Sequence, residues 1–209
     1  GAVVGAGQCG RGGQCRRVRK VALTGWPNRL ACQEYLQKSL LGTMRGAQAF
    51  VVVLISLDVS SLGRRRVMTP DEATDVLQES LSRLNACLAR NVPDDLNGEE
   101  GCFVARYGAM DLAVVTGIPS ERRRHFLESL ALEILLMLSG SVSVAGEVID
   151  VEPAIGMAVS TSGDGEILVE AVETALRDAR GERAGRYSNF DPREERAGNR
   201  QQSLFRDVR

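Results

Sequence analysis

The residues whose types and spacing could support chemistry lie in one short segment, residues 106–112, with the sequence Arg-Tyr-Gly-Ala-Met-Asp-Leu. Apolar runs flank this segment on both sides, and that pattern predicts two strands joined by a tight turn. Asp111 is the acid of the turn. A carboxylate is the hard oxygen ligand that Mg²⁺ requires, whereas the thioether of Met110 is soft and uncharged. Because neighbouring residues of a strand point to opposite faces, Asp111 is not expected to bind a metal ion on the face to which residue 110 points.

Helices and a sheet must position this turn. Residues 50–59 form a continuous apolar run that contains Asp58 near its end, which is typical of a buried central strand. Thr69 followed by Pro70 predicts a helix start, and Pro153 predicts an edge or a bulge in its strand. The order of elements predicts an α/β sandwich, with a central mixed sheet and helices on its faces. We expect helices over residues 30–44, 70–90, 120–138 and 166–180, and strands over residues 50–59, 102–105, 112–115, 141–144, 147–160 and 186–190.

Composition and charge limit the classes of protein to which this chain can belong. Its 209 residues are 44% hydrophobic and carry a net charge of −1, which offers no electrostatic case for a nucleic-acid partner or an anionic membrane. No run reaches the ~18 apolar residues of a transmembrane helix, and no signal peptide is evident. Five cysteines without a zinc-type Cys-x-x-Cys pair indicate reduced thiols in a cytoplasmic protein.

The two ends of the chain differ in composition from its middle. Residues 1–20 are rich in glycine and arginine, and they contain Gly5, Gly7 and Gly10 at the spacing of a dinucleotide-binding loop. An Arg-Gly-Gly sequence follows where that loop requires a helix, so we expect a flexible connector instead. Residues 191–209 are polar and strongly charged. Two alternatives stay open for them, a linker with a helix or a disordered tail.

Five blocks of this sequence, taken in order, resemble the GGDEF family of diguanylate cyclases, and the likeness extends over residues 21–190. The turn segment resembles the family signature Arg-Tyr-Gly-Gly-Asp-Glu-Phe, and the resemblance implies a nucleotidyl-cyclase-like palm fold. The other four blocks are residues 23–29 (Leu-Thr-Gly-Trp-Pro-Asn-Arg), 57–62 (Leu-Asp-Val-Ser-Ser-Leu), 153–158 (Pro-Ala-Ile-Gly-Met-Ala) and 172–180 (Val-Glu-Thr-Ala-Leu-Arg-Asp-Ala-Arg).

The resemblance implies a site for GTP, because the family joins two GTP molecules into cyclic di-GMP with the help of divalent metal ions. Asp58 matches the first metal-binding aspartate of the family and is the candidate metal ligand. Gly108 and Arg180 match positions that meet the phosphates, and Asp75 falls near a position that reads guanine. Mg²⁺ is expected only where GTP binds. Alternatively, Asp58 ends a strand as a structural residue, and Arg180 serves the dipole of its helix.

The same comparison implies that the chemistry of the signature has been lost. Ala109 adds a methyl group where a phosphate would approach the backbone, and Met110 replaces the second metal-binding acid. Asp111 and Leu112 complete the altered signature, so no intact catalytic site is expected. Further departures are residues 63–67, which lack the asparagine that reads guanine, Ala184 in place of an arginine, and Glu99 and Cys102 in place of the product-feedback site.

These losses predict a degenerate GGDEF domain without cyclase activity in bacterial cyclic di-GMP signalling. Its expected role is regulatory, through dimerisation, protein contact or GTP sensing. Residues 191–209 resemble the connector to an EAL phosphodiesterase domain, so an attached EAL domain outside this chain is the expected partner. Two alternatives remain open. The first is a weak or active diguanylate cyclase that uses Asp58, Asp111 and Arg180, and the second is an interaction module that binds no nucleotide.

Overall fold

The computed structural model describes eight parts of the chain, residues 25–44, 49–59, 68–92, 102–118, 123–144, 146–160, 165–181 and 187–190. Within these parts, no helix combines the length and the apolar character needed to cross a bilayer. Several of the predictions above concern other residues and lie outside the described parts: the glycine-rich residues 1–20, the start of the helix expected from residue 120, residues 63–67, Glu99, Ala184 and residues 191–209.

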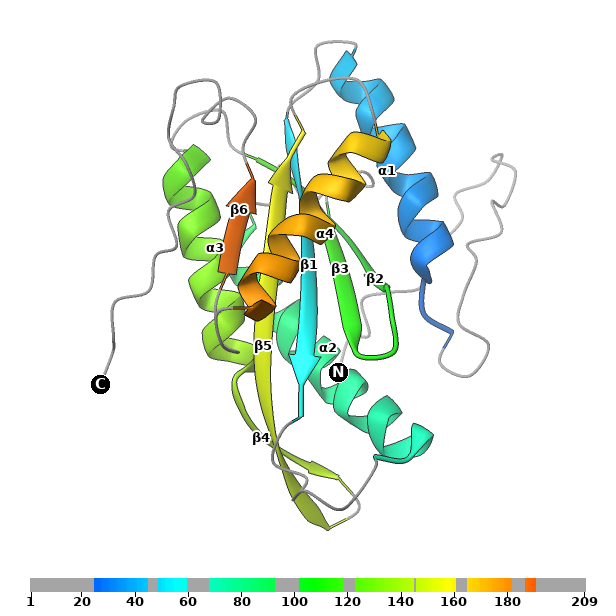
Figure 1. Ribbon diagram of the computed structural model, residues 1–209, viewed down its shortest axis with the longest axis vertical. Helices are drawn as coiled ribbons and strands as arrows, with labels where there is room; N and C mark the ends of the chain where they lie inside the picture. The colour runs from blue at the N-terminus through cyan, green and yellow to red at the C-terminus, as the bar shows by residue number, and fades with distance from the viewer. Residues whose placement is uncertain are drawn as a thin grey trace.

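The described residues form four helices and one mixed sheet of six strands, which confirms the predicted α/β class (Figure 1). The strand order is β2-β3-β1-β5-β4, and β6 pairs with β5. All pairs are antiparallel except β5 with β6, which are parallel. The helices are α1 (Arg29–Met44), α2 (Pro70–Asn91), α3 (Arg123–Leu138) and α4 (Gly165–Gly181). The strands are β1 (Phe50–Asp58), β2 (Cys102–Arg106), β3 (Asp111–Gly117), β4 (Gly140–Val144), β5 (Glu147–Val159) and β6 (Tyr187–Phe190).

Strand β1 lies at the centre of the sheet, and all of its residues except Asp58 are buried. Because side chains alternate along a strand, β1 contributes to a separate apolar cluster on each face of the sheet. Its odd-numbered residues belong to a cluster with α2 and α3, and Phe50, Val52 and Leu54 belong to a cluster with α1 and α4. In Figure 1, α4 crosses the front of the sheet while α2 lies behind it. The continuous apolar run thus forms the doubly buried strand that the sequence predicted.

Strand β5 is longer than β1 and has different neighbours along its length. Its first five residues, 147–151, pair with β4, and residues 155–158 pair with β6. Pro153 lies between these two stretches, where β5 pairs with β1 alone among the described strands. A proline has no N–H to offer a second neighbour, so this gap suits it. The expectation that Pro153 marks an edge is confirmed.

The helix starts and faces agree in part with the sequence. Thr69 caps α2 and forms a capping box with Glu72, because each side chain accepts a hydrogen bond from the backbone N–H of the other. In α1, the spacing of the apolar residues Leu30, Tyr35, Leu36, Leu40 and Leu41 predicts a stripe that faces the core. This prediction is partly wrong, because Leu30 is 38% exposed and Leu41 is 56% exposed. The stripe that faces the sheet contains Cys32 and is completed by two leucines at four-residue intervals, Leu36 and Leu40.

Helix α4 approaches the sheet most closely at Gly156 of β5. A Cβ atom placed on Gly156 would lie 2.6 Å from the Cα atom of Leu176 and 2.7 Å from the carbonyl oxygen of Val172. Both are backbone atoms of α4, which cannot turn aside as a side chain can. Gly156 therefore sets the distance between α4 and the sheet, and α4 carries the side chains that reach the turn.

We expect the substitution Gly156→Ala to lower the free energy of unfolding by about 1–3 kcal/mol, because the added methyl group forces α4 away from β5. Urea denaturation followed by circular dichroism measures this change. Gly181→Ala is the matched control, since a Cβ there meets no atom within 4 Å. Equal stability of the two variants would contradict the close approach.

Candidate functional site

The turn between β2 and β3 is closed by its own backbone and by one arginine. The N–H groups of Tyr107 and Gly108 donate to the carbonyl oxygen of Asp111, at 2.8 and 3.2 Å. The guanidinium of Arg106 donates to the carbonyl oxygens of Gly108 and Ala109, both at 3.1 Å. These bonds fix the turn from inside, and they occupy two of the carbonyl groups that a bound cation could use.

Two neighbouring segments hold the turn from outside. The N–H of Leu57 donates to the carbonyl oxygen of Met110 at 2.9 Å, which extends the pairing of β1 with β3 to the turn itself. On the other side, the N–H of Arg106 donates to the carbonyl oxygen of Pro27 at 2.9 Å. Asp58 comes directly after Leu57 and is exposed. The turn is therefore a fixed part of the sheet edge, with Asp58 beside it.

Helix α4 contacts the turn through Arg180. Its Nη2 atom lies 2.7 Å from Oδ1 of Asp111 and also donates to the hydroxyl of Ser56 on β1. Gly108 makes room for this arrangement, because a Cβ on Gly108 would lie 3.1 Å from Cγ of Asp111 and closer still to one of its carboxylate oxygens. The only acid of the turn is thus directed to α4 and paired there.

A second contact joins α4 to the turn two helical turns before Arg180. Glu173 accepts a hydrogen bond from the hydroxyl of Tyr107 at 2.8 Å and pairs with Arg29 at 3.0 Å. The guanidinium of Arg29 also lies over the Tyr107 ring, 4.6 Å from its centre. Burial raises the pKa of Tyr107 above its ordinary range, and the hydrogen bond to Glu173 raises it further. These contacts connect α1, the turn and α4.

Met110 and Asp111 point to opposite faces of the sheet, as the alternation of a strand requires. Met110 packs against the apolar cluster formed with α2 and α3, whereas Asp111 meets Arg180 on the α4 face. Ser56 lies opposite Asp111 in the register of β1 and β3, and alternation places Asp58 on the same face. Two carboxylates therefore share the α4 face, but the guanidinium already occupies one of them.

A Mg²⁺ ion is the cofactor that the resemblance implies, and the described residues do not fit it as they lie. The side chain of Met110 offers no oxygen, and the carboxylate of Asp111 is already paired with the guanidinium of Arg180. Among the residues with described positions, no three His, Cys, Asp or Glu side chains gather as a metal site. Asp58 remains as a single carboxylate. One carboxylate is too few to hold a hard divalent cation when no substrate supplies further oxygen ligands.

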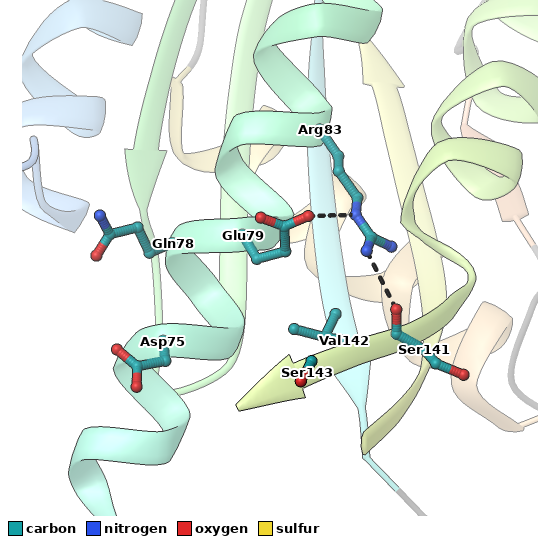
Figure 2. A pocket seen from close by; sticks show the side chains of 7 residues that line it. All are labelled: Asp75, Gln78, Glu79, Arg83, Ser141, Val142 and Ser143. Carbon is teal, nitrogen blue, oxygen red and sulfur yellow. Dashed lines mark hydrogen bonds and ion pairs between the residues drawn. The ribbon is translucent and has the colours of Figure 1, made fainter. Parts of the chain in front are cut away.

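Asp75 lies in a different place from the turn. It lines an open pocket of about 660 Å³ between α2 and β4 (Figure 2). Arg83 crosses this pocket, since it pairs with Glu79 at 2.9 Å and donates to the carbonyl oxygen of Ser141 at 3.1 Å. The remaining lining residues are Gln78, Val142 and Ser143. None of the other three nucleotide-binding candidates, Asp58, Gly108 and Arg180, contributes to the lining.

The structure thus brings together part of the predicted set. Asp111, Gly108 and Arg180 meet at the turn, whereas Asp75 belongs to a separate pocket. The roles of Ser56, Arg29, Tyr107 and Glu173 in this network were missed. Ser56 carried one visible signal, because it is the only polar residue between Phe50 and Leu57. The other three belong to the matched blocks, but nothing in their spacing indicates that they meet.

The described cysteines and the histidine lie outside this network. Cys32, Cys87 and Cys102 are free thiols. Burial raises the pKa of Cys32 to about 12 and that of Cys102 to about 11, so both thiols stay protonated and poorly nucleophilic at neutral pH. His125 is exposed and shares a hydrogen bond with Ser129, as expected for a surface residue.

Comparison with known proteins identifies the fold. No family model and no curated protein matches the sequence. Solved structures do match, and they are GGDEF domains. The GGDEF domain of YfiN from Pseudomonas aeruginosa has a TM-score of 0.65 at 18% identity, over 85% of this chain and 99% of that one. The diguanylate cyclase SiaD of the same organism, solved with its activator SiaC, has a TM-score of 0.63 at 19% identity over 82% of this chain.

The match to SiaD covers 61% of the SiaD chain, so this chain spans about three fifths of that protein. A diguanylate cyclase/phosphodiesterase from Caldicellulosiruptor saccharolyticus is also similar, with a TM-score of 0.55 at 20% identity over 82% of this chain and 93% of that one. At such identities the likeness establishes the fold. The expected GGDEF-type palm fold is therefore confirmed.

The contact between Tyr107 and Glu173 yields a prediction about stability. We expect Tyr107→Phe and Glu173→Gln each to destabilise the protein, with a coupling energy of about 1 kcal/mol, because the first removes the donor and the second replaces the charged acceptor by a weaker, neutral one. Urea denaturation of the two single variants and the double variant measures this coupling. Tyr107→Phe combined with Glu128→Gln on α3 is the control pair, for which additive effects are expected. Additivity of the first pair would contradict the bond.

The raised pKa of Tyr107 yields a prediction about pH. Above about pH 10 the unfolded chain loses the phenol proton of Tyr107, whereas the folded protein keeps it. The contribution of the protonated Tyr107 to stability is therefore fully present below about pH 10 and is lost as the pH rises further. We expect the free energy of unfolding to fall between pH 8 and pH 11, and to fall less in Tyr107→Phe. Equal losses in the two proteins, measured by urea denaturation at both pH values, would refute the assignment.

Proposed function

We propose that this chain is a GGDEF-type module that does not make cyclic di-GMP and that has a regulatory role in cyclic di-GMP signalling. The proposal is supported by the directions of two neighbouring side chains in the turn, which point to opposite faces of the sheet. Met110 packs into the apolar cluster with α2 and α3, and the adjacent Asp111 pairs with Arg180. The turn keeps the shape of a catalytic hairpin while it presents no free acid at position 110.

The chemistry of the reaction explains why this loss is severe. Joining two nucleoside triphosphates requires metal ions that neutralise the triphosphate and the charge that develops in the transition state. An uncharged thioether cannot hold such an ion, and Asp58 alone supplies one carboxylate. Mg²⁺ would therefore bind at the site only together with GTP, because the phosphates of GTP supply the missing oxygen ligands. The module would therefore bind GTP only weakly.

A regulatory module acts on a partner, and we propose an EAL phosphodiesterase domain attached beyond this chain. Residues 191–209 resemble the connector to such a domain. The similar protein from C. saccharolyticus is a diguanylate cyclase/phosphodiesterase, which supports this arrangement. SiaD was solved with an activator protein, which supports protein contact as a means of control. Self-association, protein contact and GTP sensing are the three forms that the regulation can take.

A weak diguanylate cyclase is the second candidate, and one observation favours it. Asp58 and Asp111 lie on the same face as Arg180, so displacement of the guanidinium would free Asp111 on the face that also carries Asp58. In that case a metal ion brought by GTP would bind between Asp58 and Asp111. The second candidate therefore predicts a reaction that depends on Asp58.

Incubation of the purified protein with GTP and Mg²⁺, and separately with Mn²⁺, distinguishes the two candidates. We expect no cyclic di-GMP by liquid chromatography and mass spectrometry, with SiaD as the positive control for the assay. The matched variant is Asp58→Asn. Turnover by the wild-type protein that disappears in Asp58→Asn would refute the proposed function and establish the cyclase. A trace of cyclic di-GMP that persists unchanged in Asp58→Asn would come from a contaminating enzyme, and the proposed absence of cyclase activity would stand.

A further inference from the structure

The pair formed by Arg180 and Asp111 joins three separate elements. Arg180 comes from the last turn of α4, Asp111 is the first residue of β3, and Ser56 of β1 accepts a further hydrogen bond from the same guanidinium nitrogen. The side chain of Arg180 is 50% exposed and that of Asp111 is 26% exposed. The guanidinium therefore has one side bonded to the sheet and one side open to solvent.

The sheet fixes the acid in this position before any ligand arrives. Ser56 and Asp111 are opposite each other in the register of β1 and β3, so the hydroxyl and the carboxylate lie on the same face. The main-chain oxygen of Asp111 accepts two N–H bonds from the turn, and Gly108 leaves space for its carboxylate. The carboxylate therefore needs little further ordering to meet Arg180, which favours the internal pair over a free anion.

The other arginines of this region have different partners. Arg29 pairs with Glu173, and Arg106 bonds the carbonyl groups of the turn. Arg180 instead donates to the hydroxyl of Ser56 and to the carboxylate of Asp111, which takes the place that another oxyanion could occupy. A guanidinium binds carboxylate and phosphate oxygens with the same fork of N–H groups, so the two kinds of anion compete for it.

We propose that Asp111 is an internal, autoinhibitory ligand: its carboxylate occupies an anion-binding position formed by Arg180 and Ser56, and excludes phosphate from it. The inference rests on the proposed function, since it explains how a module without turnover holds its turn closed in the absence of nucleotide. It assigns the position to phosphate-type anions, which enter when the carboxylate is neutralised or displaced. Contacts that move the turn away from α4 would open the position.

Binding of inorganic pyrophosphate without divalent metal tests the proposal, by isothermal titration calorimetry at low salt. We expect Asp111→Asn to bind pyrophosphate about tenfold tighter than the wild-type protein, because it frees one guanidinium for charge-assisted hydrogen bonds. Adding Arg180→Met to Asp111→Asn should return the affinity to the wild-type level. Thermal unfolding and circular dichroism establish that each variant is folded.

Glu128→Gln is the matched control. It removes the same charge from an exposed pair, Arg124 with Glu128 on α3, in which the arginine is 55% exposed. We expect this variant to bind pyrophosphate no better than the wild-type protein. A gain in Glu128→Gln equal to that in Asp111→Asn, or a gain that survives Arg180→Met, would reduce the effect to net charge and overturn the proposal. An unchanged affinity in Asp111→Asn would overturn it as well.

A measurement on the wild-type protein covers the case in which Asp111→Asn does not fold. The Nε–H resonance of Arg180, assigned by its loss in Arg180→Met, should not move when pyrophosphate is added, and a clear shift would overturn the proposal. The test is separate from that of the proposed function. Cyclic di-GMP production from GTP by the wild-type protein would refute the absence of turnover, whereas the pyrophosphate data refer to the internal pair alone.

Discussion

The antiparallel register between β1 and β3 is the constraint on which the rest of the structure depends. Strand β1 is buried on both faces, so each of its apolar residues belongs to one of two clusters, and a shift by one residue would exchange them all. The observed register is therefore strongly favoured in free energy over a register shifted by one residue. It places Ser56 opposite Asp111 and the N–H of Leu57 against the carbonyl of Met110. The geometry of the turn follows from the packing of the core.

The same alternation gives the two neighbouring residues Met110 and Asp111 different surroundings. A methionine is well suited to position 110, because its side chain extends the cluster with α2 and α3, where an ionised carboxylate would lose solvation. The acid at the next position is directed to α4, where a cation receives it. Each side chain is satisfied by a protein partner. A turn that is complete in this way has little need of a metal ion or a nucleotide for its order.

The elements were largely predictable, because their signals are local. The doubly apolar run of β1, the cap of α2 at Thr69 and the position of Pro153 follow from hydrophobic period and backbone chemistry, and each is confirmed. The stripe of α1 was partly wrong, since Leu30 and Leu41 are exposed. Period alone does not say which side of a helix meets the sheet. The packing of α1 against β2, β3 and α4 decides this.

The sequence by itself determined the fold class, the order of elements and the place of the turn between β2 and β3, because these depend on residue type and on spacing over short distances. It also determined that Met110 cannot hold Mg²⁺, which is a property of the side chain alone. The tertiary structure decided the partners. Arg180 is 69 residues from Asp111 and 124 from Ser56, and Asp75 is directed to a separate pocket. These contacts depend on the strand register and on the close packing of α4 against Gly156. Neither can be predicted from a local sequence pattern.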